Sequence, residues 1–145
     1  MPLPPASTKV LSAGLVIVHF DGDRYRLLAL RAFNTWDFVR TDVAEGDDPM
    51  QAAVNQTREL TGLTDLELAW DDAHRDTLAS GDGSVTRYYM AESKTAEVLL
   101  RVPPGDGGIE DFEYRWVTAE EAEDTLPPRL AIILGWALGK LAAAR

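Results

Sequence analysis

The stretch that decides the fold runs from Trp36 to Leu63 and reads WDFVRTDVAEGDDPMQAAVNQTRELTGL. Asp47 or Asp48 can accept hydrogen bonds from the free amides of a first helical turn, and the proline after them suits the first helical position. Gly62 stands where a helix commonly ends in a left-handed residue. The stretch therefore predicts a short strand, a sharp loop and a helix over residues 49–61.

The spacing of this stretch resembles the signature of the Nudix hydrolases. That signature has a glycine, a glutamate six positions on, and seven residues later Arg-Glu-hydrophobic-any-Glu-Glu-any-Gly-hydrophobic. Thr61, Gly62 and Leu63 match its end and set the register. Glu59 then matches the first of the paired glutamates, and Gly46 matches the glycine that precedes the first glutamate. The resemblance implies an α/β fold, the Nudix α/β/α sandwich with a mixed β-sheet, and hydrolysis of phosphoric anhydrides with Mg²⁺ or Mn²⁺.

The acidic letters of the signature are where this sequence departs from the family. Leu60 stands in place of the second paired glutamate, and Gln56 replaces the glutamate after the arginine. Asn55 replaces that arginine, Asp47 the first glutamate and Thr41 the opening glycine. A hard cation such as Mg²⁺ needs several oxygen ligands, normally carboxylates and water. We therefore expect a degenerate Nudix box and weak or lost catalysis.

The resemblance also implies which residues would hold a metal ion. Glu59 is the candidate catalytic acid on the helix, and Gln56 can still coordinate through its neutral carbonyl. In the diadenosine tetraphosphate hydrolases a glutamate before the last strand reaches the metal site and is a candidate general base. Glu110 falls at that place, with Glu113 as the other possibility. Glu45 is a further candidate metal ligand that would partly compensate for the missing carboxylates. The alternative for Glu45 and for Glu110 is a free loop acid.

Two further residues are candidates for substrate binding by the same resemblance. The branch that the chain resembles most is the diadenosine tetraphosphate hydrolases, through the runs RYYMAE and EDFEYRWVTAEEA. Arg40 follows Phe38 and Val39, where that branch commonly has a lysine after Phe-Pro, and a guanidinium can hold phosphate oxygens in a two-pronged way. Tyr88 aligns with a tyrosine that lines the nucleotide pocket, where a ring can stack on a base. The alternatives are a surface arginine and a packed strand aromatic.

The rest of the chain alternates strand-like and helix-like patterns. β-Branched and apolar runs predict strands over residues 10–20, 24–31, 66–70, 73–78, 85–92 and 96–102. A Tyr-any-Trp-Val strand follows at Tyr114, and Thr118 with Glu121 predicts a capping box that opens the next helix. The two prolines at 127 and 128 separate it from a last helix over 129–141, whose apolar residues would pack on the sheet or on a partner.

Length, charge and composition limit the classes of function. With 145 residues and 46% hydrophobic content, we expect residues 1–9 to be an N-terminal arm and 10–145 a single domain. The net charge of −10 argues against binding to nucleic acid or to anionic membranes. The absence of cysteine excludes disulfides and thiolate chemistry. No secretion leader or membrane span is recognisable, so a cytoplasmic location is the default expectation.

Two functions are consistent with these observations. The first is a Nudix-like domain of the nucleoside polyphosphate, dinucleoside tetraphosphate-like, pyrophosphohydrolase type, with weak or lost catalysis. The second is a module that binds a nucleotide or another small phosphorylated ligand without cleaving it. A homodimer through the apolar last helix is a third, structural possibility.

Overall fold

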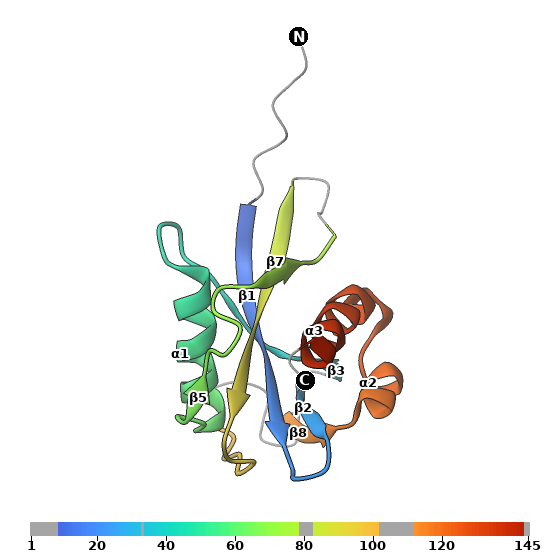
Figure 1. Cartoon of the computed structure of the whole chain (residues 1–145). Helices are drawn as coiled ribbons and strands as arrows, with labels where there is room; N and C mark the ends of the chain where they lie inside the picture. The colour runs from blue at the N-terminus through green and yellow to red at the C-terminus, as the bar shows by residue number, and fades with distance from the viewer. Residues whose placement is uncertain (1–8, 33, 79–82, 102–111, 144–145) are drawn as a thin grey trace.

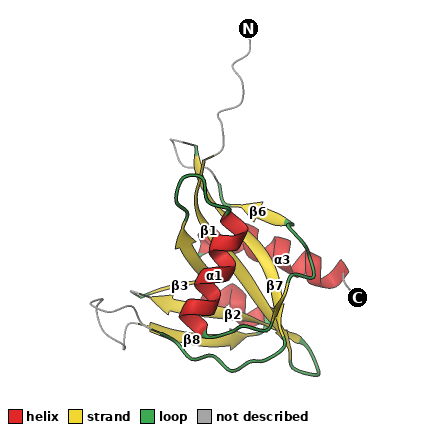
Figure 2. Cartoon of the chain, turned by 90° about the vertical axis from the view of Figure 1, so that its left-hand side faces the viewer, coloured by secondary structure: helices red, strands yellow, loops and turns green. Residues whose placement is uncertain are grey.

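The computed structural model describes residues 9–32, 34–78, 83–101 and 112–143. A mixed β-sheet separates helix α1 (Pro49–Thr61) from helices α2 (Ala119–Thr125) and α3 (Ala131–Ala143), as Figure 1 shows. In the view of Figure 2, turned by 90°, α1 lies in front of the sheet and α3 behind it. The predicted α/β/α sandwich is confirmed.

Strand β1 (Lys9–Phe20) lies at the centre of the sheet and has neighbours on both sides. It runs parallel to β7 (Ser84–Ser93) along most of its length. Its other side is shared, because its first half pairs with β4 (Val39–Asp42) and its last three residues pair with β2 (Tyr25–Ala32), both antiparallel. The remaining strands are β3 (Thr35–Asp37) and β8 (Phe112–Val117) on β2, and β5 (Leu66–Glu67) and β6 (His74–Asp76) on β7.

Apolar side chains fill both faces of this sheet. Tyr88 belongs to the buried cluster on the side of α2 and α3, whereas Tyr89 belongs to the cluster on the side of α1. The two neighbours lie on opposite faces because side chains alternate along a strand, as predicted. The apolar residues of the last helix also pack on the sheet; those that are buried are Leu130, Ile133, Leu134, Ala137 and Leu141.

Helix α1 begins and ends where its sequence predicts. Asp48 is its N-cap, and the carboxylate of Asp48 accepts a hydrogen bond from Met50 N at 3.2 Å. Gly62 ends the helix with φ of 73°, a left-handed conformation that a residue without a Cβ adopts readily. The second predicted helix, α2, has the expected capping box, in which Thr118 and Glu121 bond each other's backbone amides.

One predicted strand is wrong, and others are shorter than expected. The predicted strand over residues 96–102 is not formed in its described part, 96–101. Leu99 N instead donates to Thr61 O at 2.9 Å, and Arg101 N donates to Leu60 O at 2.8 Å. The segment thus satisfies free carbonyls at the end of α1, while Val98 and Leu100 pack into the core on that side. The last helix starts later than predicted, after a 3₁₀ turn at Pro128–Leu130 (η2).

Candidate ligand-binding site

Three of the four predicted metal ligands lie on α1 or in the loop before it. Glu59 is exposed and is the only acidic residue of α1, while Gln56 is half-buried. Glu45 is exposed in the loop. Glu110 lies outside the described residues. Glu113, the other possibility for the general base, is on β8 and forms ion pairs with Arg31 at 2.8 Å and Arg115 at 3.3 Å.

The donor set of the described residues does not fit a magnesium ion. Leu60 packs against the buried cluster on the α1 side of the sheet, at the position where the resemblance puts a glutamate. Within the described ranges, no three His, Cys, Asp or Glu side chains come together to hold a metal. One carboxylate and one amide on a helix are fewer oxygen ligands than a hard divalent cation needs.

Arg40 and Tyr88, the two predicted substrate-binding residues, are brought together by Asp37. The Tyr88 hydroxyl donates to Asp37 Oδ1 at 2.8 Å, and Arg40 Nε lies 3.5 Å from Asp37 Oδ2. Asp37 ends β3 and Arg40 lies on β4, so this contact forms at the junction between these two consecutive strands. The roles predicted for Arg40 and Tyr88 remain predictions.

Arg129, a residue that the sequence did not single out, completes this group. It lies on η2, at the start of the last helical segment, and its Nη2 donates to Asp37 Oδ2 at 3.2 Å. We call Asp37, Arg40, Tyr88 and Arg129 the Asp37 cluster. Because 92 residues separate Arg129 from Asp37 in sequence, local patterning could not have paired them.

Burial differs sharply among the members of the Asp37 cluster. The side chain of Asp37 is 13% exposed, whereas those of Arg40 and Arg129 are 46% and 45% exposed. Burial works against the charged form of Arg129, but the charge of Asp37 and the hydrogen bond to it more than offset this, so its pKa is raised. The Arg129 guanidinium therefore remains cationic beside a carboxylate that is nearly enclosed.

Tyr88 is fully buried, which bears on the stacking role predicted for its ring. It has 0% exposure and meets Phe38 edge-on, with the ring centroids 5.9 Å apart. Burial raises the pKa of Tyr88, and the charge of Asp37 and the hydrogen bond to it act in the same direction. In this structure the hydroxyl of Tyr88 donates a hydrogen bond to Asp37. The buried ring offers no free face on which a base could stack.

A cavity of about 390 Å³ lies beside Arg129, between the start of α3 and strands β6 and β7. Arg129 is the charged member of its lining, and Thr77 and Thr86 are its polar members. Their hydroxyls already have partners, because Thr86 Oγ1 bonds Ser12 Oγ at 2.7 Å and Thr77 Oγ1 accepts from Thr86 N at 3.0 Å. The other lining residues are Leu78, Pro128, Ala131 and Ile132. A cavity with a cationic side chain on one wall and apolar side chains on the other suits a ligand that is part anion and part ring.

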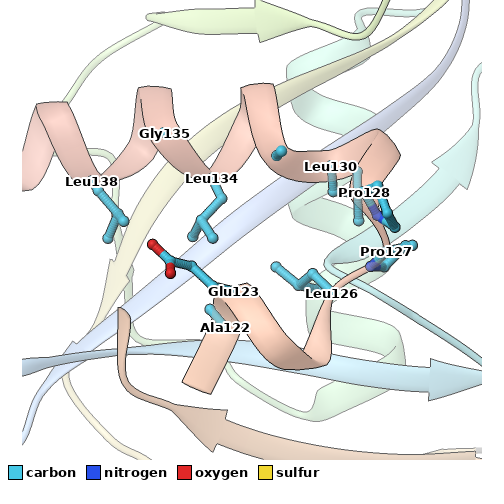
Figure 3. A pocket seen from close by; sticks show the side chains of 10 residues that line it. Ala122, Glu123, Leu126, Pro127, Pro128, Leu130, Leu134, Gly135 and Leu138 are labelled. Carbon is cyan, nitrogen blue, oxygen red and sulfur yellow. The ribbon is translucent and has the colours of Figure 1, made fainter. Parts of the chain in front are cut away.

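A second cavity of similar size lies between α2 and α3 and has the opposite character. Figure 3 shows its apolar walls, to which Leu126, Leu134 and Leu138 contribute, with the carboxylate of Glu123 at its side. Glu123 is the charged residue of its lining. A carboxylate disfavours phosphate, so the cavity beside Arg129 is the better candidate for a phosphorylated ligand.

Asp37 and Arg129 were missed because their roles arise from tertiary contacts. The sequence placed Asp37 in a short strand between two aromatic residues, and an acid at such a place is the only signal that could have drawn attention to it. Arg129 was the first residue of the predicted last helix, next to two prolines. Nothing local distinguishes it from a surface arginine.

Comparison with solved structures identifies the fold. The C. elegans Ap4A hydrolase in a binary complex is 24% identical, with 92% of this chain and 98% of that chain covered and a TM-score of 0.76. The Nudix hydrolase RenU from M. smegmatis is 20% identical, with 94% and 88% covered and a TM-score of 0.66. The NUDIX domain of NrtR from Shewanella oneidensis, complexed with ADP ribose, is 13% identical, with 93% and 90% covered and a TM-score of 0.66.

Comparison of the sequence with known protein families and curated proteins gives no match. The structural likeness shows that the chain has the fold of Nudix hydrolases. Among the described helices, none has both the length and the apolar character needed to cross a membrane.

Proposed function

We propose that this Nudix-fold chain is a domain of the nucleoside polyphosphate hydrolase type that binds a nucleotide or a similar small phosphorylated ligand and hydrolyses it weakly or not at all. The observation that carries the proposal is the packing of Leu60, which is partly buried, against the core cluster on the α1 side. Together with Gln56, it removes two carboxylates from the helix that holds the metal ligands in the family signature. Fold alone does not determine activity, so the residues at the site decide.

The ligand class is supported by two solved structures and by the charge of the Asp37 cluster. One similar protein is named an Ap4A hydrolase, and another was solved with ADP ribose. Both compounds join nucleosides or sugars through phosphate groups. Arg40 has the geometry to contact such groups, because nearly half of its side chain is in solvent while Asp37 lies against its Nε.

The retained acid Glu59 favours a second candidate function, metal-dependent hydrolysis. For this function, acids from outside α1 would have to complete the donor set, with Glu110 as the candidate general base and Glu45 as a further ligand. The described donors alone do not fit Mg²⁺ or Mn²⁺. The second candidate therefore depends on Glu110, which the structure does not describe.

A thermal-shift series separates the two functions. The protein is heated with ADP, ATP, Ap4A or ADP-ribose, each in EDTA and in MgCl₂. A ligand that binds only the folded state raises Tm by mass action. Binding without metal-dependent hydrolysis predicts a shift by at least one nucleotide in EDTA, equal to the shift in MgCl₂. Shifts that occur only with MgCl₂, together with product release that Glu59→Gln abolishes, would replace the proposal with the hydrolase.

A further inference from the structure

The Asp37 cluster has more positive than negative charges. Two guanidiniums face one carboxylate, which leaves a local charge of about +1 on a chain whose net charge is −10. Nearly half of each arginine side chain is in solvent. A local cation on an acidic protein is a specific place for an anionic group to bind, since the surrounding surface repels it.

The hydrogen bonds of the cluster show which groups have unused capacity. Asp37 Oδ1 accepts from Phe38 N at 2.7 Å and from the Tyr88 hydroxyl at 2.8 Å. Its Oδ2 accepts from Arg129 and lies near Arg40 Nε. The carboxylate is therefore fully engaged, whereas each guanidinium has five N–H donors and uses few of them on the described residues. The free donors are what a phosphate needs.

The cavity beside Arg129 limits the size of the ligand. Its volume of about 390 Å³ is near the lower end of the range for small-molecule pockets, about 300–1,000 Å³. One nucleoside fits such a volume better than two. Leu78 and Ile132 provide apolar contact for a base.

We propose that Arg40 and Arg129 bind the phosphate groups of a mononucleotide-sized ligand directly, without a divalent cation, on the face of the sheet opposite α1. The base enters the cavity beside Arg129. Asp37 is a positioning residue that holds the two guanidiniums at a common place. This inference rests on the proposed function, and it adds the site, the size of the ligand and the independence from metal.

Calorimetric titration with ADP in EDTA tests the role of Arg129. The expected result is binding by the unchanged protein and a Kd that rises by about tenfold or more in Arg129→Gln, because a charge-assisted hydrogen bond is lost. Arg58→Gln makes the same charge change on α1, at an exposed position on the other face, and should leave Kd within about twofold. Circular dichroism confirms that each variant is folded.

Asp37→Asn separates positioning from simple electrostatics. The substitution removes a negative charge beside the site, so electrostatics alone predicts tighter binding of the anion. Loss of the common anchor of the two guanidiniums predicts weaker binding instead, because each then has to be ordered on binding. We expect a higher Kd for ADP, and a lower Kd would overturn the role given to Asp37.

The probes distinguish failure of this inference from failure of the proposed function. Inorganic pyrophosphate should bind more weakly than ADP. Arg129→Gln should not measurably weaken the binding of adenosine. ADP binding that needs MgCl₂, or that Arg129→Gln leaves within twofold, overturns the inference while the proposed function stands. No binding of any nucleotide, with or without MgCl₂, overturns both.

Discussion

The ring of Tyr88 lies so close to Gly14 that a Cβ built on Gly14 would be 2.4 Å from both Cδ1 and Cε1 of the ring. The two residues are partners in the parallel pairing of β1 with β7. The same Cβ would also lie 2.8 Å from Val39 O on the other neighbouring strand. The missing side chain therefore allows the Tyr88 ring to cross β1 and its hydroxyl to reach Asp37.

Gly14→Ala should destabilise the fold. The added methyl group meets a buried ring and a backbone carbonyl, neither of which can move freely, so we expect a loss of about 1–3 kcal/mol in the free energy of unfolding. Urea unfolding followed by fluorescence measures this. Gly139→Ala is the matched control, because a Cβ there meets nothing within 4 Å. A helical glycine replaced by alanine should gain up to about 1 kcal/mol.

Tyr88→Phe should change the response of stability to alkaline pH. Burial raises the pKa of Tyr88 above its ordinary value of 10.0, so above pH 10 the unfolded chain releases this proton while the folded chain keeps it. The free energy of unfolding should therefore fall as pH rises above 10. In Tyr88→Phe this part of the decline should be absent. Unfolding curves between pH 8 and about pH 11 measure it, and equal slopes in the two proteins would contradict the buried hydroxyl.

Asp48→Ala should weaken helix α1, whereas Asp47→Ala should not. Asp48 is the N-cap, and its carboxylate accepts from Met50 N. Loss of such a cap costs about 0.5–2 kcal/mol. Asp47 is exposed, and its backbone amide bonds Ala44 O, a contact that alanine keeps. Thermal unfolding of both variants measures the difference in stability. A larger loss of stability for Asp47→Ala would contradict the assignment of Asp48 as the N-cap.

Restoring the two missing carboxylates should create a response to metal. In the double variant Gln56→Glu with Leu60→Glu, α1 regains the acids of the family signature, so MgCl₂ should raise its Tm. The variant should start from a lower Tm, because Leu60 contributes to the core on the α1 side. The unchanged protein should show little shift with MgCl₂. An equal shift in both proteins would mean that other acids already hold the metal.

The elements that local chemistry determines were predictable from the sequence. Helix α1 has an aspartate cap, an early proline and a terminal glycine, and its bounds match the prediction. The segment 96–101 shows the limit of such reasoning. Its apolar residues are typical of a strand, but Val98 and Leu100 pack beside α1. The amides of Leu99 and Arg101 bond helix carbonyls instead of a sheet.

The candidate site was predictable only in part. Arg40 and Tyr88 were reached through resemblance, whereas their meeting at Asp37 depends on contacts across the chain. The hydrogen bond from Tyr88 to Asp37 spans 51 residues and that from Arg129 spans 92. Pairs at such separations leave no periodic signal in one sequence. The predicted role of Glu110 remains a prediction, because that residue lies outside the described ranges.

The most direct test of the central claim is a turnover measurement. The protein and its Glu59→Gln variant are incubated with MgCl₂ or MnCl₂ and a panel of nucleoside polyphosphates, and the release of phosphate and nucleotide is followed. We predict that the unchanged protein releases little or no more product than Glu59→Gln does. Sustained turnover that Glu59→Gln abolishes would show that α1 still holds a catalytic metal, and it would contradict the account.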